Sequence, residues 1–460
     1  ADGSLVAGSV AISGAFTRQA WEDYVDGAIR DAANKETSSK DWVLDVAGND
    51  DLTLEGSPAQ IRKMLVTMYK QEYASEWKRF VQGIAVRDLG NFDQAVTAMN
   101  QLGDPQNSPL RKVLLTLYEQ TSWDNPSQAK AGIQKADTGV VAWFKRLFSR
   151  ATPSRVNVDV DVNVAGAMTE LPVGPVGKEF AGVGRIVVDH DDNSLLRGYL
   201  ATLSKLRTRF NQIKNQGDPG PGSRELMQQT LEGNGSELAD ALRYVDEQML
   251  TGMDASQREA LRPILVRPLV QAFSVIVEPT AVELNKVWHA QVYGLFQQSL
   301  ASKYPFAPGA KMEAAPSEIA QVFGPEGAVS KYVASTMGPL VIRRGDLISP
   351  KTWGDQSLAL RQDFVTGFAQ WVAPLSGGAA QGAEAAQSQT LFQILPQPVS
   401  GLTEYTIEID GQQLRYRNTP AQWTNFVWPN ARGTPGAKVS AVTFDGRTIE
   451  LVNEPGNFGL

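Results

Sequence analysis

Cysteine is absent from all 460 residues, and histidine occurs only twice. The chain therefore has no thiolate nucleophile, no disulfide and no cysteine-ligated zinc. A protein of this length can bury a core without disulfides, so the absence leaves its compartment open. Histidine catalysis could use only His190 and His289. Because His289 follows Trp288 in a helical pattern, with no nucleophile beside it in the sequence, we expect a partly buried structural residue.

Runs of basic residues are also missing. The net charge is −7 and the isoelectric point is near 5.2, which argues against binding to nucleic acid or to an anionic membrane surface. No uninterrupted apolar run has the length of a membrane span. The closest, residues 261–282, is broken by charged residues and prolines: Arg262, Pro263, Arg267, Pro268, Glu278 and Pro279. Residues 1–4 have no signal-peptide features, and we expect this chain itself to be soluble.

Motifs for catalysis or cofactor binding are not found. Residues 174–178 resemble a phosphate-binding loop, but position 172 is proline and Glu179 stands where Ser or Thr is required. Gly182-Val183-Gly184 lacks the third glycine of a dinucleotide fingerprint, since Val187 occupies its position. We predict no catalytic residue, no cofactor and no metal site.

A pair of carboxylates is the remaining kind of catalytic site that this composition allows. With 50 acidic residues, two could meet in space and hydrolyse a glycosidic bond, as in a muramidase. The pattern selects no such pair. The acidic residues that recur at helical spacing are interpreted as solvated helix faces: Glu72, Glu76, Asp240, Asp246 and Glu247.

The first 150 residues predict a helical domain. Apolar residues recur at the spacing of one buried helix face, first Trp21, Tyr24, Val25, Ala28 and Ile29, and later Ile61, Met64, Leu65, Met68, Tyr73, Trp77 and Phe80. Ser57-Pro58-Ala59-Gln60 is a capping box that begins the second of these helices. Aromatic residues at helical spacing are typical of a core, so we interpret Tyr73 and Trp77 as core residues rather than a carbohydrate-stacking surface. Ser108-Pro109 begins another helix after the breaker at residues 103–105.

Residues 151–185 predict an irregular connector with one edge strand. Valines alternate with polar residues from Val156 to Val164, and a stretch rich in glycine and proline follows. Carboxylates two residues apart on a strand point the same way and cannot surround a calcium ion, so an exposed edge strand is the preferred interpretation.

Helical periodicity returns in residues 186–375, which predict a second helical domain. Its apolar positions include Leu195, Tyr199, Leu203, Leu206, Phe210, Leu238, Leu242, Val245, Met249, Phe364, Phe368 and Trp371. Residues 217–223 are predicted to form a loop between two helices, and residues 376–388 a linker.

The last segment, residues 389–460, predicts a small antiparallel β-sandwich. Tyr405, Ile407 and Ile409 alternate with polar residues before Asp410-Gly411, a hairpin turn. A second Asp-Gly, at residues 445–446, joins two further apolar runs in the same way. The fold class expected for the whole chain is therefore α+β multidomain, with mostly α-helical domains followed by this sandwich.

Short motifs along most of the chain resemble one family. The most informative is Lys303-Tyr304-Pro305-Phe306, followed by Val322-Phe323-Gly324-Pro325-Glu326-Gly327. The others lie at residues 14–18, 41–44, 69–73, 76–80, 108–111, 409–412 and 428–429. In this order and spacing they resemble the periplasmic part of the IcmF/TssM family, the inner-membrane scaffold of bacterial type VI secretion systems.

The resemblance implies a non-enzymatic scaffold in the periplasm, excised from an inner-membrane protein. It implies contact with the outer-membrane lipoprotein TssJ through residues 389–460, contact with TssL through a membrane portion absent here, and self-association within the membrane complex. It also implies further strands after Leu460, so we expect the sandwich to be incomplete. No nucleic acid or small-molecule substrate is expected. The alternative is a periplasmic peptidoglycan hydrolase or wall-binding module.

Overall fold

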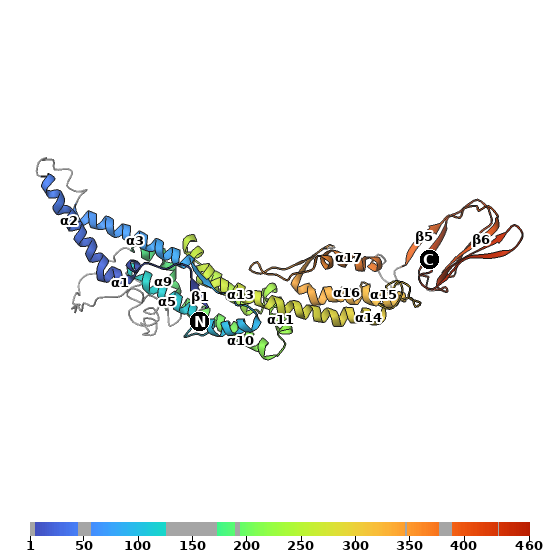
Figure 1. Ribbon diagram of the computed structural model, residues 1–460, viewed down its shortest axis with the longest axis horizontal. Coiled ribbons are helices and arrows are strands. Elements are labelled where there is room, and N and C mark those ends of the chain that lie inside the picture. Colours follow the sequence, from blue (N-terminus) through green and yellow to red (C-terminus); the bar gives the residue numbers. More distant parts are fainter. Residues whose placement is uncertain are drawn as a thin grey trace. The chain divides into compact units, whose positions relative to one another are not determined.

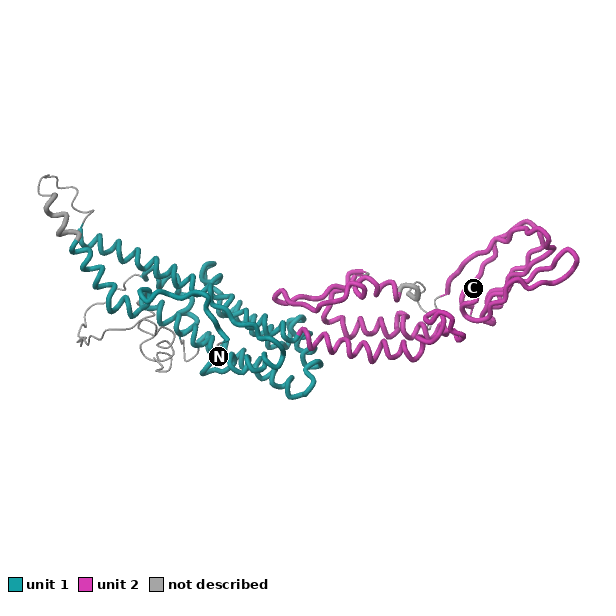
Figure 2. The backbone as a smooth tube through the Cα atoms, viewed as in Figure 1, with its two compact units in different colours: residues 1–276 teal, residues 277–460 magenta. Residues whose placement is uncertain are grey.

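A computed structural model describes residues 5–44, 57–125, 173–188, 194–345, 347–376, 389–430 and 432–460, with the backbone alone described for residues 36–44 and 373–376. The chain forms two compact units, residues 1–276 and 277–460 (Figure 2). The five-segment division expected from sequence remains a proposal. The alternating valines of residues 156–164 lie outside the described residues.

Unit 1 is mainly helical (Figure 1). Its longer helices are α2 (Asp26–Leu44), α3 (Pro58–Gln82), α4 (Phe92–Leu102), α5 (Pro109–Thr121), α10 (Leu195–Asn215), α11 (Pro219–Glu232) and α12 (Glu237–Tyr244). Its shorter elements are η1 (Gly14–Phe16), α1 (Arg18–Ala20), η2 (Trp21–Val25), η3 (Ser122–Asp124), α8 (Pro175–Glu179), α9 (Ala181–Val187) and η4 (Val245–Met249). The strands β1 (Val6–Gly8) and β2 (Ile84–Val86) pair antiparallel. Helix α13 (Ala255–Trp288) begins in this unit.

Local start signals are confirmed in this unit. The Ser57 hydroxyl accepts a hydrogen bond from the Gln60 amide at 3.3 Å at the start of α3. Pro109 is the first residue of α5, as expected from Ser108-Pro109. Tyr73 and Trp77 are fully buried, and the Tyr73 hydroxyl donates to the backbone oxygen of Gln120 at 2.6 Å. Their interpretation as core residues is therefore confirmed.

The predicted buried stripe on these helices is wrong at several positions. Tyr24, Met64 and Met68 are 66%, 57% and 58% exposed. In this part of the unit α2 and α3 pack against each other. Each helix therefore buries only the side chains that face the other helix, and the rest of the predicted stripe is exposed. On α3 the buried positions are Ile61, Tyr73, Trp77 and Val81.

Two irregular segments expected from sequence contain helices. Residues 175–179 and 181–187 form α8 and α9, although this stretch was predicted to be a connector. Similarly, α11 begins at Pro219 within the predicted loop 217–223. The Asp218 carboxylate accepts a hydrogen bond from the Gly220 amide at 2.9 Å, and this cap allows a Gly- and Pro-rich sequence to begin a helix.

Unit 2 begins with a helical part, residues 277–376. After α13 its elements are η5 (His289–Tyr293), α14 (Gly294–Ser299), α15 (Pro316–Phe323), α16 (Ala328–Lys331), η6 (Tyr332–Met337), η7 (Gly338–Leu340), β3 (Val341–Arg344), β4 (Leu347–Pro350) and α17 (Gln362–Ser376). One core cluster joins them, and Leu300, Val322, Val333 and Phe368 are among its buried members. The hairpin β3–β4 was not predicted, and His289, expected to be partly buried, is exposed.

The C-terminal part of unit 2 is built from antiparallel strands, as predicted. The strands are β5 (Thr390–Ile394), β6 (Leu402–Ile409), β7 (Gln412–Tyr416), β8 (Thr424–Trp428), β9 (Gly436–Thr443) and β10 (Thr448–Pro455). One sheet has the order β10-β9-β6-β7, and β5 pairs with β8 in a second sheet. Both Asp-Gly turns lie where the sequence places them, between β6 and β7 and between β9 and β10.

One helical run has the length and hydropathy of a membrane span. Residues 255–299 are long and apolar enough to cross a membrane. The charged residues and prolines between Leu261 and Val282 had indicated that this stretch is too interrupted. Of the apolar window, 61% is buried inside the protein, as in the core helix of a soluble protein.

Candidate partner-binding surface

Reactive side chains do not gather in the described part of the chain. Within those residues no group of three or more His, Asp or Glu side chains could hold a metal ion. The His289 ring lies tilted against the Tyr293 ring, with centroids 5.1 Å apart, and His190 lies outside the described residues. Glu72, Asp240, Asp246 and Glu247 are exposed, in agreement with solvated helix faces. The side chain of Glu76 is only 15% exposed, so this interpretation is wrong for Glu76.

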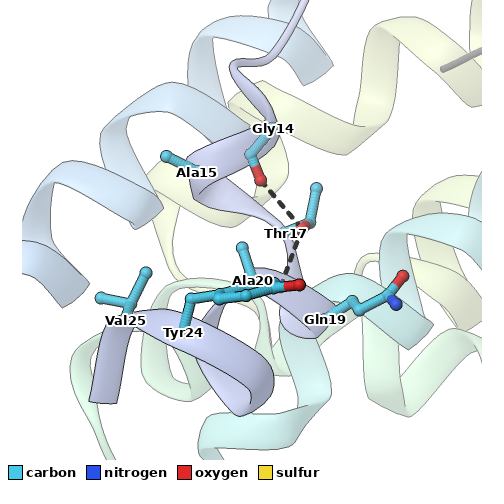
Figure 3. Close-up of a pocket in the computed structure, with 7 residues that line it drawn as sticks. All are labelled: Gly14, Ala15, Thr17, Gln19, Ala20, Tyr24 and Val25. Carbon is cyan, nitrogen blue, oxygen red and sulfur yellow. Dashed lines mark hydrogen bonds between the residues drawn. The ribbon is translucent and has the colours of Figure 1, made fainter. Parts of the chain in front are cut away.

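A hollow lies beside η1 and η2 (Figure 3). Thr17 is one of the residues that line this hollow. Its hydroxyl group donates a hydrogen bond to the Gly14 backbone oxygen at 3.0 Å and accepts one from the Ala20 amide at 3.1 Å. The lining residues are Gly14, Ala15, Thr17, Gln19, Ala20, Tyr24 and Val25. None is a carboxylate, a histidine or a cation, so this hollow has no acid–base pair for hydrolysis.

The most buried ion pair of the described chain joins Lys70 to Asp124. The Lys70 ammonium also lies 5.5 Å and 5.4 Å from the ring centroids of Trp21 and Trp123. The second carboxylate oxygen of Asp124 accepts from the Val176 amide at 3.0 Å, at the beginning of α8. Every polar atom of this pair is used to hold α8 against α3 and η3, so its role is structural.

The C-terminal sheet has one apolar face that is covered unevenly. Directly paired residues point to the same face, so Tyr416, Tyr405, Ala441 and Ile449 form one row across the sheet from β7 to β10. Tyr416 and Ala441 are 4% and 1% exposed, whereas Ile449 is 37% exposed. Burial is therefore lost at the β10 end of the row.

A second row repeats this gradient. Leu414, Ile407, Val439 and Val452 are paired across the same four strands. Leu414 is 6% exposed and Val452 is 42% exposed. The small second sheet supplies the cover, because Phe392 and Phe426 pack on Leu414 at the β7 side. We name the exposed positions Ile449 and Val452 the open face.

Neither edge of the second sheet pairs with another strand in the described residues. β8 pairs with β5 on one side. On its other side, Gln412 of β7 donates from its amide nitrogen to the Val427 backbone oxygen at 2.7 Å and accepts from the Val427 amide at 3.0 Å. The outer edge of β5 therefore remains open to pairing, and Leu391 on that strand is 77% exposed. Unpaired edges and exposed apolar faces are typical of protein–protein contacts.

The sequence named no contact residue and gave only the range 389–460. Ile449 and Val452 carry a weak signal, since apolar residues follow the second Asp-Gly turn. What distinguishes them from core residues is the strand order of the two sheets, which the local pattern does not contain.

The fold is that of a multidomain α+β protein whose C-terminal part is built from antiparallel strands. Three family models match the chain in order: "IcmF-related: Intracellular multiplication and human macrophage-killing" over residues 2–122, the "Type VI secretion protein IcmF helical domain" over 279–379, and the "Type VI secretion protein IcmF C2-like domain" over 392–460. Together they place the chain in the IcmF/TssM family, as the sequence motifs indicate.

Individual relatives agree with this assignment. "Type VI secretion system component TssM1" of Pseudomonas aeruginosa strain PAO1 is 23% identical over 437 residues, which are 92% of this chain and 36% of the relative. The chain thus spans about a third of that protein's length.

Two solved structures share the fold. A chain of a "Type VI secretion system membrane core complex" is similar with a TM-score of 0.70 and 20% identity, covering 99% of this chain and 80% of the other. A chain of a "Type VI membrane complex" gives 0.67 and 20%, covering 97% and 74%.

Proposed function

We propose that this chain is a non-enzymatic structural part of a type VI secretion membrane complex, positioned in the periplasm. In this role it links the inner membrane to an outer-membrane lipoprotein of the TssJ type. The contact lies within residues 389–460, and the inner-membrane partner TssL is contacted by a portion of the protein outside this chain. The observation that supports the proposal most strongly is an interaction module of the IcmF type with an apolar face that its own sheets leave exposed.

The open face and the β5 edge fit one partner surface. Gln412 ties β8 to β7, so a strand added to the free edge of β5 would extend the second sheet away from β7. Ile449 and Val452 on β10, at the other end of the four-stranded sheet from β7, are exposed on the face that the second sheet leaves uncovered. An extended segment of the lipoprotein could then pair with the β5 backbone and cover the open face with its side chains.

The contact is tested by titrating the soluble domain of the TssJ-type lipoprotein from the same gene cluster into variants of the chain. Ile449→Asp combined with Val452→Asp places two charges on the open face and should weaken binding at least about ten-fold, since burying an unpaired charge is costly. Val282→Asp changes a residue of α13 that is 60% exposed and should bind as the unmodified chain does. Equal binding by all three would remove the open face from the contact.

The alternative, a peptidoglycan hydrolase or wall-binding module, makes a different prediction. Hydrolysis requires two carboxyl groups at a cleft, one with a raised pKa. We expect no release of soluble muropeptides when the chain is incubated with peptidoglycan. Turnover that a single Asp or Glu substitution abolishes would establish the hydrolase and overturn the scaffold.

A further inference from the structure

The loop that carries the Tyr304-Pro305 motif is held closed by its own hydrogen bonds. The Tyr304 amide donates to the Met312 backbone oxygen at 2.8 Å, and the Ala314 amide donates to the Tyr304 oxygen at 2.9 Å. At the base of the loop, Lys303 forms an ion pair with Glu318 at 2.5 Å. These bonds hold residues 303–314 together and pair the backbone of Tyr304 with that of Glu313.

A turn that follows β10 meets this loop. The Glu313 carboxylate accepts a hydrogen bond from the Asn457 amide. The Phe458 ring lies edge-on to Tyr304, with centroids 5.7 Å apart, and 6.3 Å from Trp428 at the end of β8. The loop of the helical part therefore contacts the turn after β10, and through Phe458 the turn packs on the end of β8. We name these contacts the joint.

Gly456 makes this close approach possible. A Cβ atom at this position would clash with a carboxylate oxygen of Glu313, and the backbone φ of +114° is one that other residues rarely adopt. The Gly456 amide donates to the Pro435 oxygen at 3.1 Å, which ties the turn to the beginning of β9. Any side chain at residue 456 would push Glu313 away from the Asn457 amide.

We propose that the joint is a latch that fixes the orientation of the C-terminal sheets relative to the helical part of unit 2. The hydrogen bond from the Asn457 amide to the Glu313 carboxylate is directional, and the contacts of the Phe458 ring with Tyr304 and Trp428 add to it. With the latch closed, residues 277–376 and 389–460 move as one body. A partner bound to the C-terminal sheets then transmits force directly into the helix bundle. This inference does not depend on which partner binds.

The absence of native cysteine makes the test direct. Cysteines at the exposed positions Ser317 on α15 and Gln413 on β7 receive spin labels, and electron–electron double resonance measures the distances between them. The parent chain should give one narrow distance distribution. Glu313→Ala and Gly456→Ala should each replace it with a broad one. Gly446→Ala is the matched control, because Gly446 also has a positive φ but has nothing within 4 Å of its would-be Cβ.

A narrow distribution retained in both Glu313→Ala and Gly456→Ala would overturn the latch. So would a broad distribution in the parent chain. Hydrogen exchange of the β6 and β9 amides is measured on the same samples. If Gly456→Ala unfolds the sheets, the distance distribution of Glu313→Ala alone decides whether the latch exists. This substitution truncates a side chain of the helical part and leaves the β-strand sequence unchanged.

Discussion

The side-chain amide of Gln412 pairs with both backbone groups of Val427, with distances of 2.7 Å and 3.0 Å. A residue at the start of β7 thereby takes the place of a strand next to β8. The two sheets are thus joined by a hydrogen-bonded side chain as well as by their apolar core.

Replacing this amide should loosen β8. Gln412→Ala leaves the Val427 amide and carbonyl without their partners, at a cost of about 1–3 kcal/mol. The Val427 amide should then exchange with solvent faster than in the parent chain. Gln413→Ala is the matched control. The side-chain amide of Gln413 donates a hydrogen bond only to the Glu408 carboxylate at the exposed surface, so its loss should not affect β8. Equal exchange in both variants would contradict a structural role for Gln412.

The pair of Lys70 and Asp124 should be the most sensitive charged site in unit 1. Their side chains are 19% and 4% exposed, so Asp124→Ala leaves a partly buried ammonium unpaired and frees the Val176 amide. We expect the free energy of unfolding of unit 1 to fall by about 3 kcal/mol. Denaturant unfolding combined with hydrogen exchange at α8 measures this change.

The control is Asp363→Ala, which removes an exposed partner of Arg361 and should leave stability unchanged. If Asp124→Ala unfolds at the same denaturant concentration as this control, the pair does not hold α8.

The segment from 126 to 172 should be removable. The residues on either side of it meet, since the Gly174 amide donates to the Asp124 oxygen at 2.9 Å. Joining residue 125 to residue 173 with a short Gly/Ser linker therefore needs no movement of the described helices, and a shorter connection has a smaller entropic cost of closure. The deletion should retain the far-ultraviolet circular dichroism of the helices and shift the melting temperature of unit 1 only slightly. Loss of the cooperative transition would contradict this expectation.

Alkaline pH should weaken unit 1 through its buried tyrosines. Partial burial raises the pKa of Tyr69 to about 12, and burial raises the pKa of Tyr73 further. The unfolded chain loses these protons first, so the stabilisation is fully present below about pH 10 and is lost as the pH rises towards 12. Melting temperatures should fall across this range. In Tyr69→Phe the fall should be shallower, although loss of the 2.6 Å bond to the Ala15 oxygen lowers stability at neutral pH. An identical slope in both proteins would contradict the assignment.

Local signals in the sequence predicted local structure well. The Ser57 cap, the helix beginning at Pro109 and both Asp-Gly hairpins depend on a few adjacent residues, and the structure contains them. The same reasoning missed the helix at Pro219, because the Asp218 cap outweighs the low helical propensity of the residues that follow. It also placed His289 in a partly buried position from periodicity alone, and that residue is exposed.

The contact surface and the joint were less accessible to sequence reasoning. Whether Ile449 is covered depends on the strand order β10-β9-β6-β7 and on where a two-stranded sheet packs. The bond between Glu313 and Asn457 joins residues 144 positions apart. Tyr304 lies within a motif of the sequence, yet nothing around Tyr304 or Phe458 indicates that the two rings meet.

The most direct test of the proposed function is calorimetric titration of the soluble domain of the TssJ-type lipoprotein into this chain and into a version ending at Ala386. The account predicts binding by the full chain and none by the shortened one, because residues 389–460 carry the contact surface. Equal binding by both would place the interface in the helical regions. Absence of binding by the full chain would contradict the proposed link to the outer membrane.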